Sequence, residues 1–343
     1  MLKSDRLPRT DFGKGSQLMS DPISITVVVC TYNRCRKLDD AIQSVANQAV
    51  SPSLRWEIMV VDNNSSDETP RVVEELKRRY PGRIRYLFER QKGVSHARNA
   101  GIREARGEII VFIDDDETAH QDWLRNLTAS LHSGEWCGVG GRVLPPPFSP
   151  PPWLALDSSF NCGPLAIFNP RQEAGELHEP PFGANMAFRR EVFERFGGFR
   201  TDLGRAGGNM ISNEDTEFGR RLLDAGLRVR YEPLALTYHP IDENRLHKGY
   251  FLSWWFNKGK SDVRESGNAA EQKSFLGIPI RWLAALTAGV MRWVVAFESS
   301  KRFTLKLIVW AYAGQIAESF HLWLDAKRKK PVHDVRKSVE GGP

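Results

Sequence analysis

One apolar run followed directly by acids constrains the fold of this chain more than any other segment. Ile109–Ile113 holds five large apolar residues without a break, and the next four residues, Asp114–Glu117, are all carboxylic acids. An uninterrupted apolar run of this length is typical of a strand buried on both faces, as in a parallel sheet. The acids then follow the carboxyl end of that strand, where open α/β sheets bind their ligands. A solvated acidic turn is the alternative, and the flanking segments decide between the two.

The chain around this run alternates between strand and helix patterns. Strands are predicted at residues 23–30, 56–62, 83–89, 136–143, 182–188 and 228–238. Helical spacing of apolar residues occurs at residues 38–45, 72–80, 94–106, 121–132, 191–196 and 214–222. Strands that alternate with helices indicate right-handed βαβ units and an α/β fold with a mostly parallel, doubly wound sheet. We therefore expect Thr31, Asp62 and Asp114, which end three of the strands, to lie at one edge of the sheet.

The overall charge and the cysteines bear on partners and location. The net charge is +6 and the pI about 9.1, which favours anionic partners: nucleotides, nucleic acid or an anionic membrane surface. Four cysteines without paired metal-ligand spacing are typical of reduced thiols in the cytosol. Residues 1–22 are polar and contain no apolar signal segment. The expected location is the cytoplasm, with a peripheral contact on the inner face of the cytoplasmic membrane as an option.

The C-terminal third has a different pattern, that of two apolar, basic-edged helices. Seven residues lie along one face of the first: Trp282, Leu283, Leu286, Val290, Trp293, Val294 and Phe297. Arg281 and Arg292 lie together on another face, and a second apolar helix covers residues 305–323. Neither helix contains the uncharged span of about 18 residues that a membrane-spanning helix requires. The pattern suits an interfacial membrane contact, or a helical hairpin packed on the main domain or in a homodimer.

The acids after the central strand are suited to hold a cation. Asp114 and Asp116 can place two carboxylates at the end of one strand, and oxygen ligands select Mg²⁺ or Mn²⁺. Such an ion can neutralise charge on a diphosphate leaving group. Asp62 is placed to accept hydrogen bonds from a nucleobase or a ribose. His239 follows a predicted strand and is either a further metal ligand or a structural histidine.

Further polar and aromatic candidates lie outside the acidic run. Glu214 and Asp215 begin a predicted helix, where acids commonly interact with the helix dipole. One of them would act as a general base if it came within hydrogen-bonding reach of an acceptor hydroxyl. Arg98 is able to pair with phosphates. Trp254–Trp255 is either a stacking platform for a ligand or part of a core.

Six motifs occur in order within residues 23–245 and together strongly resemble family 2 glycosyltransferases of the GT-A fold. They are Val27–Arg34 (VVVCTYNR), Val60–Asp67 (VVDNNSSD), Gly93–Gly101 (GVSHARNAG), Phe112–Asp116 (FIDDD), Phe182–Phe188 (FGANMAF) and Asn213–Glu217 (NEDTE). The resemblance implies an inverting transfer of a sugar from a nucleotide-diphosphate sugar, with a UDP-sugar the expected donor, to a hydroxyl of a saccharide or lipid-linked saccharide. It also implies a Mn²⁺ or Mg²⁺ cofactor and no nucleic-acid partner.

The resemblance carries over to individual positions. It makes Asp215 the catalytic base and Asp116 the metal ligand of its motif, with Asp114 nearer the ribose and His239 as a further ligand. It implies nucleotide contacts by Thr31, Tyr32, Arg34, Asp62, Arg98, Asp114 and Asp115. It implies donor-sugar or acceptor contacts by Asn185 and Glu214, beside which Trp254 and Trp255 are assigned to the same side of the site.

The expected organisation is a GT-A glycosyltransferase domain with a C-terminal helical extension. In order, the segments are a polar tail (1–22), the GT-A domain (23–245), an acceptor-side or lid segment (246–275), an amphipathic helical extension (276–330) and a basic tail (331–343). Two other functions remain as alternatives. Asp114–Thr118 also fits the nucleophile motif of haloacid-dehalogenase-like phosphatases, although three strands precede it here. The other alternative is a protein that binds sugar nucleotides without catalysis.

Overall fold

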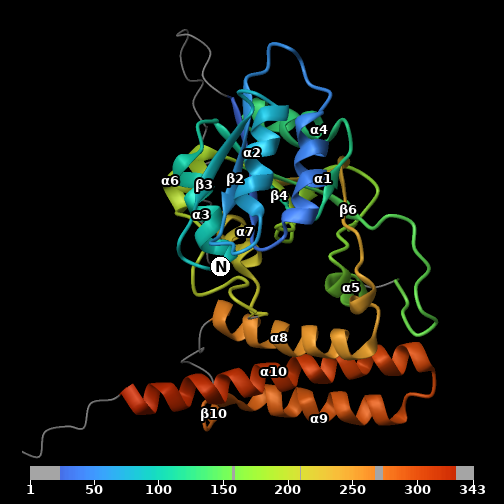
Figure 1. The fold of residues 1–343 in the computed structure, drawn as a ribbon. Helices are drawn as coiled ribbons and strands as arrows, with labels where there is room; N and C mark the ends of the chain where they lie inside the picture. Colours follow the sequence, from blue (N-terminus) through green and yellow to red (C-terminus); the bar gives the residue numbers. More distant parts are fainter. Residues whose placement is uncertain (1–23, 157–158, 209, 267–272, 330–343) are drawn as a thin grey trace, which may run out of the picture. The chain divides into compact units, whose positions relative to one another are not determined.

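The computed structural model describes residues 24–156, 159–208, 210–266 and 273–329 (Figure 1). Contacts divide the chain into two compact units, which are described separately below. The first unit contains the chain up to Ser149, with Leu165–Asn209 and Glu214–Asp242. The second contains Pro150–Pro164, Met210–Asn213 and the chain from Glu243 onward. Three short segments of the expected GT-A domain, 150–164, 210–213 and 243–245, therefore group with the C-terminal helices. The expected tails at 1–22 and 331–343 lie outside the described residues.

The first unit is built on a mixed sheet with the strand order β3-β2-β1-β4-β8-β6-β9-β5, and β7 pairs with β9. The strands are β1 (Ile25–Thr31), β2 (Trp56–Asp62), β3 (Ile84–Phe88), β4 (Ile109–Asp114), β5 (Thr118–Ala119), β6 (Gly138–Leu144), β7 (Gly175–Leu177), β8 (Asn185–Arg189) and β9 (Val229–Tyr238). The predicted α/β fold is confirmed. The predicted parallel order holds for β3, β2, β1 and β4. It ends at β8, which enters antiparallel to both β4 and β6.

Helices cover both faces of this sheet because its central strands are apolar on both sides. Alternate residues of β1 belong to two different cores: Val27 and Val29 to one, Val28 to the other. The helices of the unit are α1 (Cys35–Ala46), α2 (Thr69–Arg79), α3 (Val94–Glu104), α4 (Trp123–Ala129), α6 (Arg190–Phe196) and α7 (Glu214–Asp224). The first core includes apolar residues of α1, α2 and α4, and the second includes those of α3, α6 and α7. This is the doubly wound arrangement that the alternating pattern predicts.

The second unit is helical, with a short β-hairpin. Its elements are α5 (Ser159–Cys162), α8 (Lys248–Ser266), β10 (Ser274–Phe275), β11 (Ile278–Pro279), α9 (Ile280–Val295) and α10 (Ser299–Lys329). The long helix α10 packs against α8 and against α9 (Figure 1). Glycines permit the close contact between α8 and α10, because a Cβ at Gly259 or Gly314 would collide with the backbone of the facing helix. The expected lid segment, 246–275, is mostly the helix α8. None of the helices in the described residues has both the length and the hydropathy of a membrane-spanning segment.

Candidate active site

Three predicted site residues end neighbouring strands at one edge of the sheet. In the pairing of β1 with β2, Thr31 lies opposite Asp62, and in the pairing of β1 with β4, Cys30 lies opposite Asp114. All three strands are parallel, so their carboxyl ends meet at the same edge. The prediction that Thr31, Asp62 and Asp114 share an edge is confirmed.

The acids that follow β4 are buried and paired with cations from the start of α1. The Arg34 guanidinium Nη1 lies 2.8 Å from Asp115 Oδ1 and 2.9 Å from Asp116 Oδ2. Lys37 Nζ lies 3.9 Å from Asp116 Oδ2 and 3.2 Å from Asp242 Oδ1. Asp115 is 3% exposed and Asp116 6%. Because buried carboxylates are costly unless they are paired, Arg34 and Lys37 make this cluster tolerable.

His239 reaches the same cluster from the end of β9. Its backbone N–H donates to the Leu144 carbonyl at 2.9 Å, which fixes the residue beside the end of β6. Its Nε2 lies 3.6 Å from Asp116 Oδ1, and the side chain is buried. The two expected metal ligands, far apart in the sequence, are therefore neighbours in the structure.

A second network centres on the buried guanidinium of Arg98, on α3. Its Nη1 donates to Glu214 Oε1 at 2.7 Å, and its Nη2 donates to the Gly183 carbonyl at 3.2 Å. Nη2 also lies 3.4 Å from Asp114 Oδ1. Arg98 thus connects the end of β4 with the segment before β8 and with the start of α7. It is an internal counter-ion for two acids of the site.

Asp215, the expected base, is held by the backbone of the same segment. The Gly183 N–H donates to Asp215 Oδ2 at 2.7 Å, and the Thr216 N–H donates to Oδ1 at 2.7 Å. A Cβ at Gly183 would lie 2.6 Å from Asp215 Oδ2, closer than atoms can pack. The second residue of the Phe182–Phe188 motif therefore has to be glycine for the carboxylate to sit where it does.

Asp62 and Tyr32 lie on the β1–β2 side of the edge. Asp62 is fully buried; its Oδ1 accepts from the Ser65 N–H at 2.9 Å and its Oδ2 from the Tyr86 hydroxyl at 2.7 Å. The Lys92 ammonium donates to the Tyr32 hydroxyl at 3.0 Å and lies 5.0 Å from the ring centroid. Lys92 thus adds positive charge to the nucleotide side that the motifs predict.

Burial changes the acidity of several groups at this edge. Burial raises the pKa of Asp115 to about 6; Arg34 opposes the shift and Asp116 adds to it. Burial also raises the pKa of Glu214, with Asp215 adding to the shift and Arg98 opposing it. The pKa of Glu117 lies well above its ordinary value because the carboxyl is completely buried near Asp114 and Asp116. Negative charge is therefore costly here, and a cation would be stabilised.

Asn185, the expected donor-sugar contact, is used inside the protein. It is fully buried in β8, where its Oδ1 accepts from the Trp123 indole N–H at 2.8 Å. Its Nδ2 donates to the carbonyls of Arg142 and Ala235 at 3.0 and 2.9 Å. These contacts join β8 to α4, to the neighbouring strand β6 and to β9 beyond it. The predicted contact of Asn185 with a donor sugar stays a prediction.

Trp254 and Trp255 lie in the second unit, on α8. Their ring centroids are 5.0 Å apart with an interplanar angle of 74°, an edge-to-face pair. The Trp254 ring also covers Gly163, where an added Cβ would lie 3.1 Å from it. The packing role that was the alternative for this pair is therefore realised, and a contact with substrate remains a prediction.

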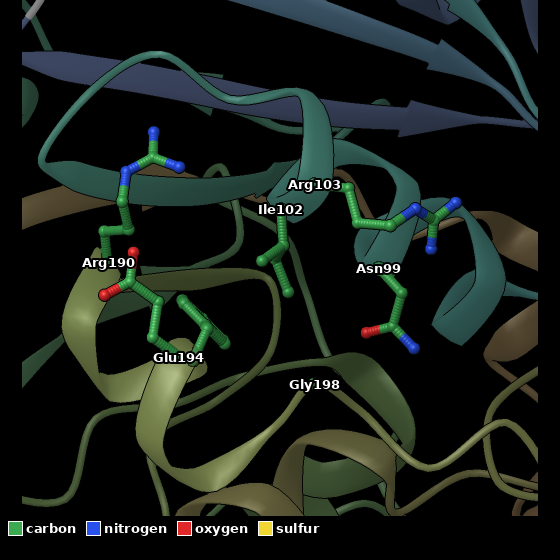
Figure 2. Close-up of a pocket in the computed structure, with 7 residues that line it drawn as sticks. Asn99, Ile102, Arg103, Arg190, Glu194 and Gly198 are labelled. Atoms are coloured by element: carbon green, nitrogen blue, oxygen red, sulfur yellow. The ribbon is translucent and has the colours of Figure 1, made fainter.

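A pocket of about 420 Å³ lies between α3 and α6 (Figure 2). Two of its polar side chains, Asn99 and Arg190, hold neighbouring backbone segments. Asn99 exchanges two hydrogen bonds with the backbone of Phe199, and Arg190 donates to the carbonyls of Ala105 and Gly107. None of the predicted site residues lines this pocket.

Sequence reasoning did not assign a site role to three residues that the structure brings to this edge. Gly183 positions Asp215, Lys37 approaches Asp116, and Asp242 pairs with Lys37. A signal existed for Gly183, because a glycine within a predicted strand marks a close approach of another group. Lys37 lies one helical turn after Arg34, so its side chain faces the same way. Nothing local in the sequence singles out Asp242.

The comparisons with known proteins agree with this fold. The sequence matches the family described as Glycosyl transferase family 2 over residues 26–197, half of the chain. The chain belongs to this family, and it is a glycosyltransferase with the GT-A fold of nucleotide-sugar transferases. Asp114–Thr118 lies within the segment that matches this glycosyltransferase family, so the alternative of a haloacid-dehalogenase-like phosphatase is wrong.

Two relatives and one solved structure give the extent of the similarity. The succinoglycan biosynthesis protein ExoM of Rhizobium meliloti is 27% identical over 87% of this chain and 93% of its own length. The glucosyl-dolichyl phosphate glucuronosyltransferase of Haloferax volcanii is 27% identical over 68% of this chain and 75% of its own length. The mannosyltransferase PcManGT of Pyrobaculum calidifontis, solved with GDP-Man and Mn²⁺, is 21% identical with a TM-score of 0.54, covering 90% of this chain and 80% of its own. That likeness supports the fold.

Proposed function

We propose that the enzyme transfers a sugar with inversion from a nucleotide-diphosphate sugar, a UDP-sugar in our hypothesis, to a hydroxyl of a saccharide or lipid-linked saccharide. One observation carries this proposal. A half-buried carboxylate, Asp215, is fixed by the Gly183 N–H in a network that also contains Asp114, at the end of the strand that leads to Asp116. A base on one side and a charge-stabilising centre on the other are what a single displacement requires.

In this reaction Asp215 takes the proton of the acceptor hydroxyl. The hydroxyl oxygen forms a bond to the anomeric carbon while the bond from that carbon to the diphosphate oxygen breaks. The electron pair leaves with the nucleoside diphosphate, and the configuration at the carbon inverts. The Gly183 N–H holds Oδ2 at 2.7 Å and so fixes the orientation of the carboxylate. A base that is already oriented avoids a loss of freedom in the transition state.

The residues at the edge fit a divalent cation, Mn²⁺ or Mg²⁺. Asp116 Oδ1 and His239 Nε2 are 3.6 Å apart, and two ligands about 2.1 Å from one ion at right angles lie roughly 3 Å apart. Among the residues that the structure describes, no three histidine, cysteine or carboxylate side chains form a metal site on their own. Ions of this type commonly take one or two carboxylates and complete their shell with water and substrate phosphates. When bound, such an ion supplies neutralisation of charge on the departing diphosphate.

The nucleotide side of the proposal rests on charge and position. Arg34 and Lys37 bring positive charge to the carboxyl ends of the strands, and Lys92 adds more beside Tyr32. Cations so placed can pair with a diphosphate. We assign the contacts with the nucleobase and the ribose to Thr31, Asp62, Asp114 and Asp115. Arg98 supports this edge of the sheet through its contacts with Asp114 and Glu214. Glu214 pairs with Arg98, and we assign it to the acceptor side with Asp215.

The acceptor class is inferred from relatives. One is named for succinoglycan biosynthesis and another for transfer to glucosyl-dolichyl phosphate, and each is matched over more than two thirds of its length. We therefore extend the proposal to a saccharide or lipid-linked saccharide acceptor, within the biosynthesis of a polysaccharide or glycan.

The test is a comparison of Asp215→Asn with Asp224→Asn, an exposed acid at the other end of α7. Purified variants are screened against nucleotide sugars with Mn²⁺ by release of nucleoside diphosphate, and nucleotide binding is measured by calorimetry. We expect Asp215→Asn to lose transfer by about 1,000-fold or more while nucleotide affinity stays within about threefold. Asp224→Asn should behave as wild type.

Stereochemistry provides a second and independent test. The product formed from a donor of known anomeric configuration is examined by NMR. Inversion supports single displacement with Asp215 as base. Retention, or full transfer by Asp215→Asn, contradicts the proposed mechanism, whereas nucleotide binding without turnover by the wild type would support the non-catalytic alternative.

A further inference from the structure

The outward face of α9 is apolar, and its side chains stay exposed among the residues that the structure describes. Ile280, Met291, Val294 and Val295 are 51, 66, 63 and 67% exposed, and Phe297, just after the helix, is fully exposed. Their spacing along α9, with exposed Ala284 and Ala288 between them, forms one continuous stripe. Soluble monomers rarely leave such stripes open, so a surface of this kind marks an interaction site.

The opposite face of α9 accounts for its folding. Gly289 is buried, and a Cβ added there would lie 3.3 Å from Val309 of α10. Trp293 lies on the same side, with Lys306 of α10 5.5 Å from its ring centroid. The face identified from sequence periodicity is therefore mainly the one that packs on α10. Because these contacts lie on the opposite side of the helix, they leave the stripe exposed among the residues that the structure describes.

The edge of the stripe is basic. Arg281 and Arg292 are exposed and lie three turns apart on one side of it, and α9 contains no aspartate or glutamate. Exposed Lys301 and Arg302 follow at the start of α10, after one exposed acid, Glu298. An apolar helix face with a cationic edge is the arrangement that binds in the plane of a membrane, with the apolar side chains in the acyl boundary and the cations at the headgroups.

We propose that the exposed face of α9 docks on an anionic lipid surface. A second copy of the chain is a poorer occupant. If two α9 helices paired face to face and antiparallel about a two-fold axis, Arg281 of one would lie beside Arg292 of the other, and like charges would repel. Anionic headgroups accept both arginines. This inference concerns anchoring and does not depend on the proposed transfer reaction.

The experiment measures binding of the full-length chain to vesicles by sedimentation. One vesicle contains equal parts of phosphatidylcholine and phosphatidylglycerol, and the other contains phosphatidylcholine alone. Met291→Glu/Val294→Glu places acids in the stripe, and Arg281→Gln/Arg292→Gln removes its basic edge. Leu234→Glu is the matched control, because Leu234 of β9 is an apolar side chain that is 68% exposed.

We expect the wild type to bind the anionic vesicles and to bind phosphatidylcholine more weakly. The arginine pair should lose roughly 30-fold in partition to anionic vesicles, since each cation near such a surface contributes about fivefold. The acidic pair should lose at least as much, and Leu234→Glu should stay within about threefold of wild type on the same scale. Equal binding of wild type and acidic pair would overturn the proposal.

Two measurements without lipid separate docking on lipid from docking on protein. The molar mass of each variant is determined by light scattering after gel filtration, and its melting temperature by circular dichroism. The proposal requires both to be the same in the acidic pair as in the wild type. A wild-type dimer that the acidic pair converts to a monomer, or a lower melting temperature in that pair, would show that protein covers the stripe and would overturn it.

Discussion

Replacing Gly183 with alanine tests whether the position of Asp215 limits catalysis. The added carbon would lie 2.6 Å from Asp215 Oδ2 and 3.0 Å from its Cβ and Cγ. Carbon contacts are relaxed at about 3.5–4.0 Å, so the carboxylate must move by several tenths of an ångström to about 1 Å. A displacement of about 1 Å at a reacting group can cost about 100-fold in rate. We therefore expect kcat to fall by about 10- to 100-fold, which is about 1.4–2.7 kcal/mol in the barrier.

The fold should tolerate this change, because Gly183 is not among the residues with a left-handed backbone. The assay is steady-state transfer together with calorimetric nucleotide binding and a melting curve. Gly175→Ala is the control, since a Cβ there comes no closer than 3.4 Å to the Arg171 side chain. Unchanged kcat in a folded Gly183→Ala variant would refute the argument that the Gly183 contact fixes the base. Loss of nucleotide binding would place the defect elsewhere.

Three further predictions concern the charged groups of the site. Arg98→Leu leaves Glu214 buried without its cation, so urea unfolding should show a loss of about 3–5 kcal/mol, whereas Arg71→Leu, at an exposed ion pair, should leave the midpoint unchanged. Since the pKa of Glu214 is raised by folding, the stability that its protonated form contributes is present below its ordinary pKa of 4.5 and is lost as pH rises through the folded value. Glu214→Gln should remove this loss of stability from a series of melting temperatures measured against pH. An unaltered series would contradict the assignment of the pH dependence to Glu214. Asp116→Asn and His239→Ala should each weaken Mn²⁺ binding, measured by electron paramagnetic resonance with nucleoside diphosphate present, by about 10-fold or more, and wild-type affinity in both would exclude them as ligands.

The parallel half of the fold was predictable because its signals are local. β2 occupies the predicted residues, Trp56–Asp62, since a run of apolar and β-branched residues between polar turns has few other conformations. The antiparallel entry of β8 was not predictable in this way. Strand direction depends on which neighbours the strand joins, and Asn185–Arg189 pairs with β4 and β6 from distant parts of the chain.

The candidate site shows the same division. Motif spacing predicted that Asp62, Asp114 and Thr31 would converge, because each ends a strand of one parallel set. It could not predict that Arg98 would bind Glu214, a contact across 116 positions. Nor could it predict that the Asn185 amide would form hydrogen bonds with the Trp123 indole and the Arg142 carbonyl. The completed fold determines the partners of a buried polar group.

The C-terminal helices show why periodicity alone leaves function open. In α9 apolar residues occur on every side, so a search for one apolar face finds the side that holds Trp282, Leu286 and Trp293. The structure packs that side on α10 and leaves the other, with Met291 and Val295, exposed. Packing and docking therefore use different sides of one helix. The contact of α9 with α10 occupies the inner face of the helix, so it leaves the outer face available for a membrane contact.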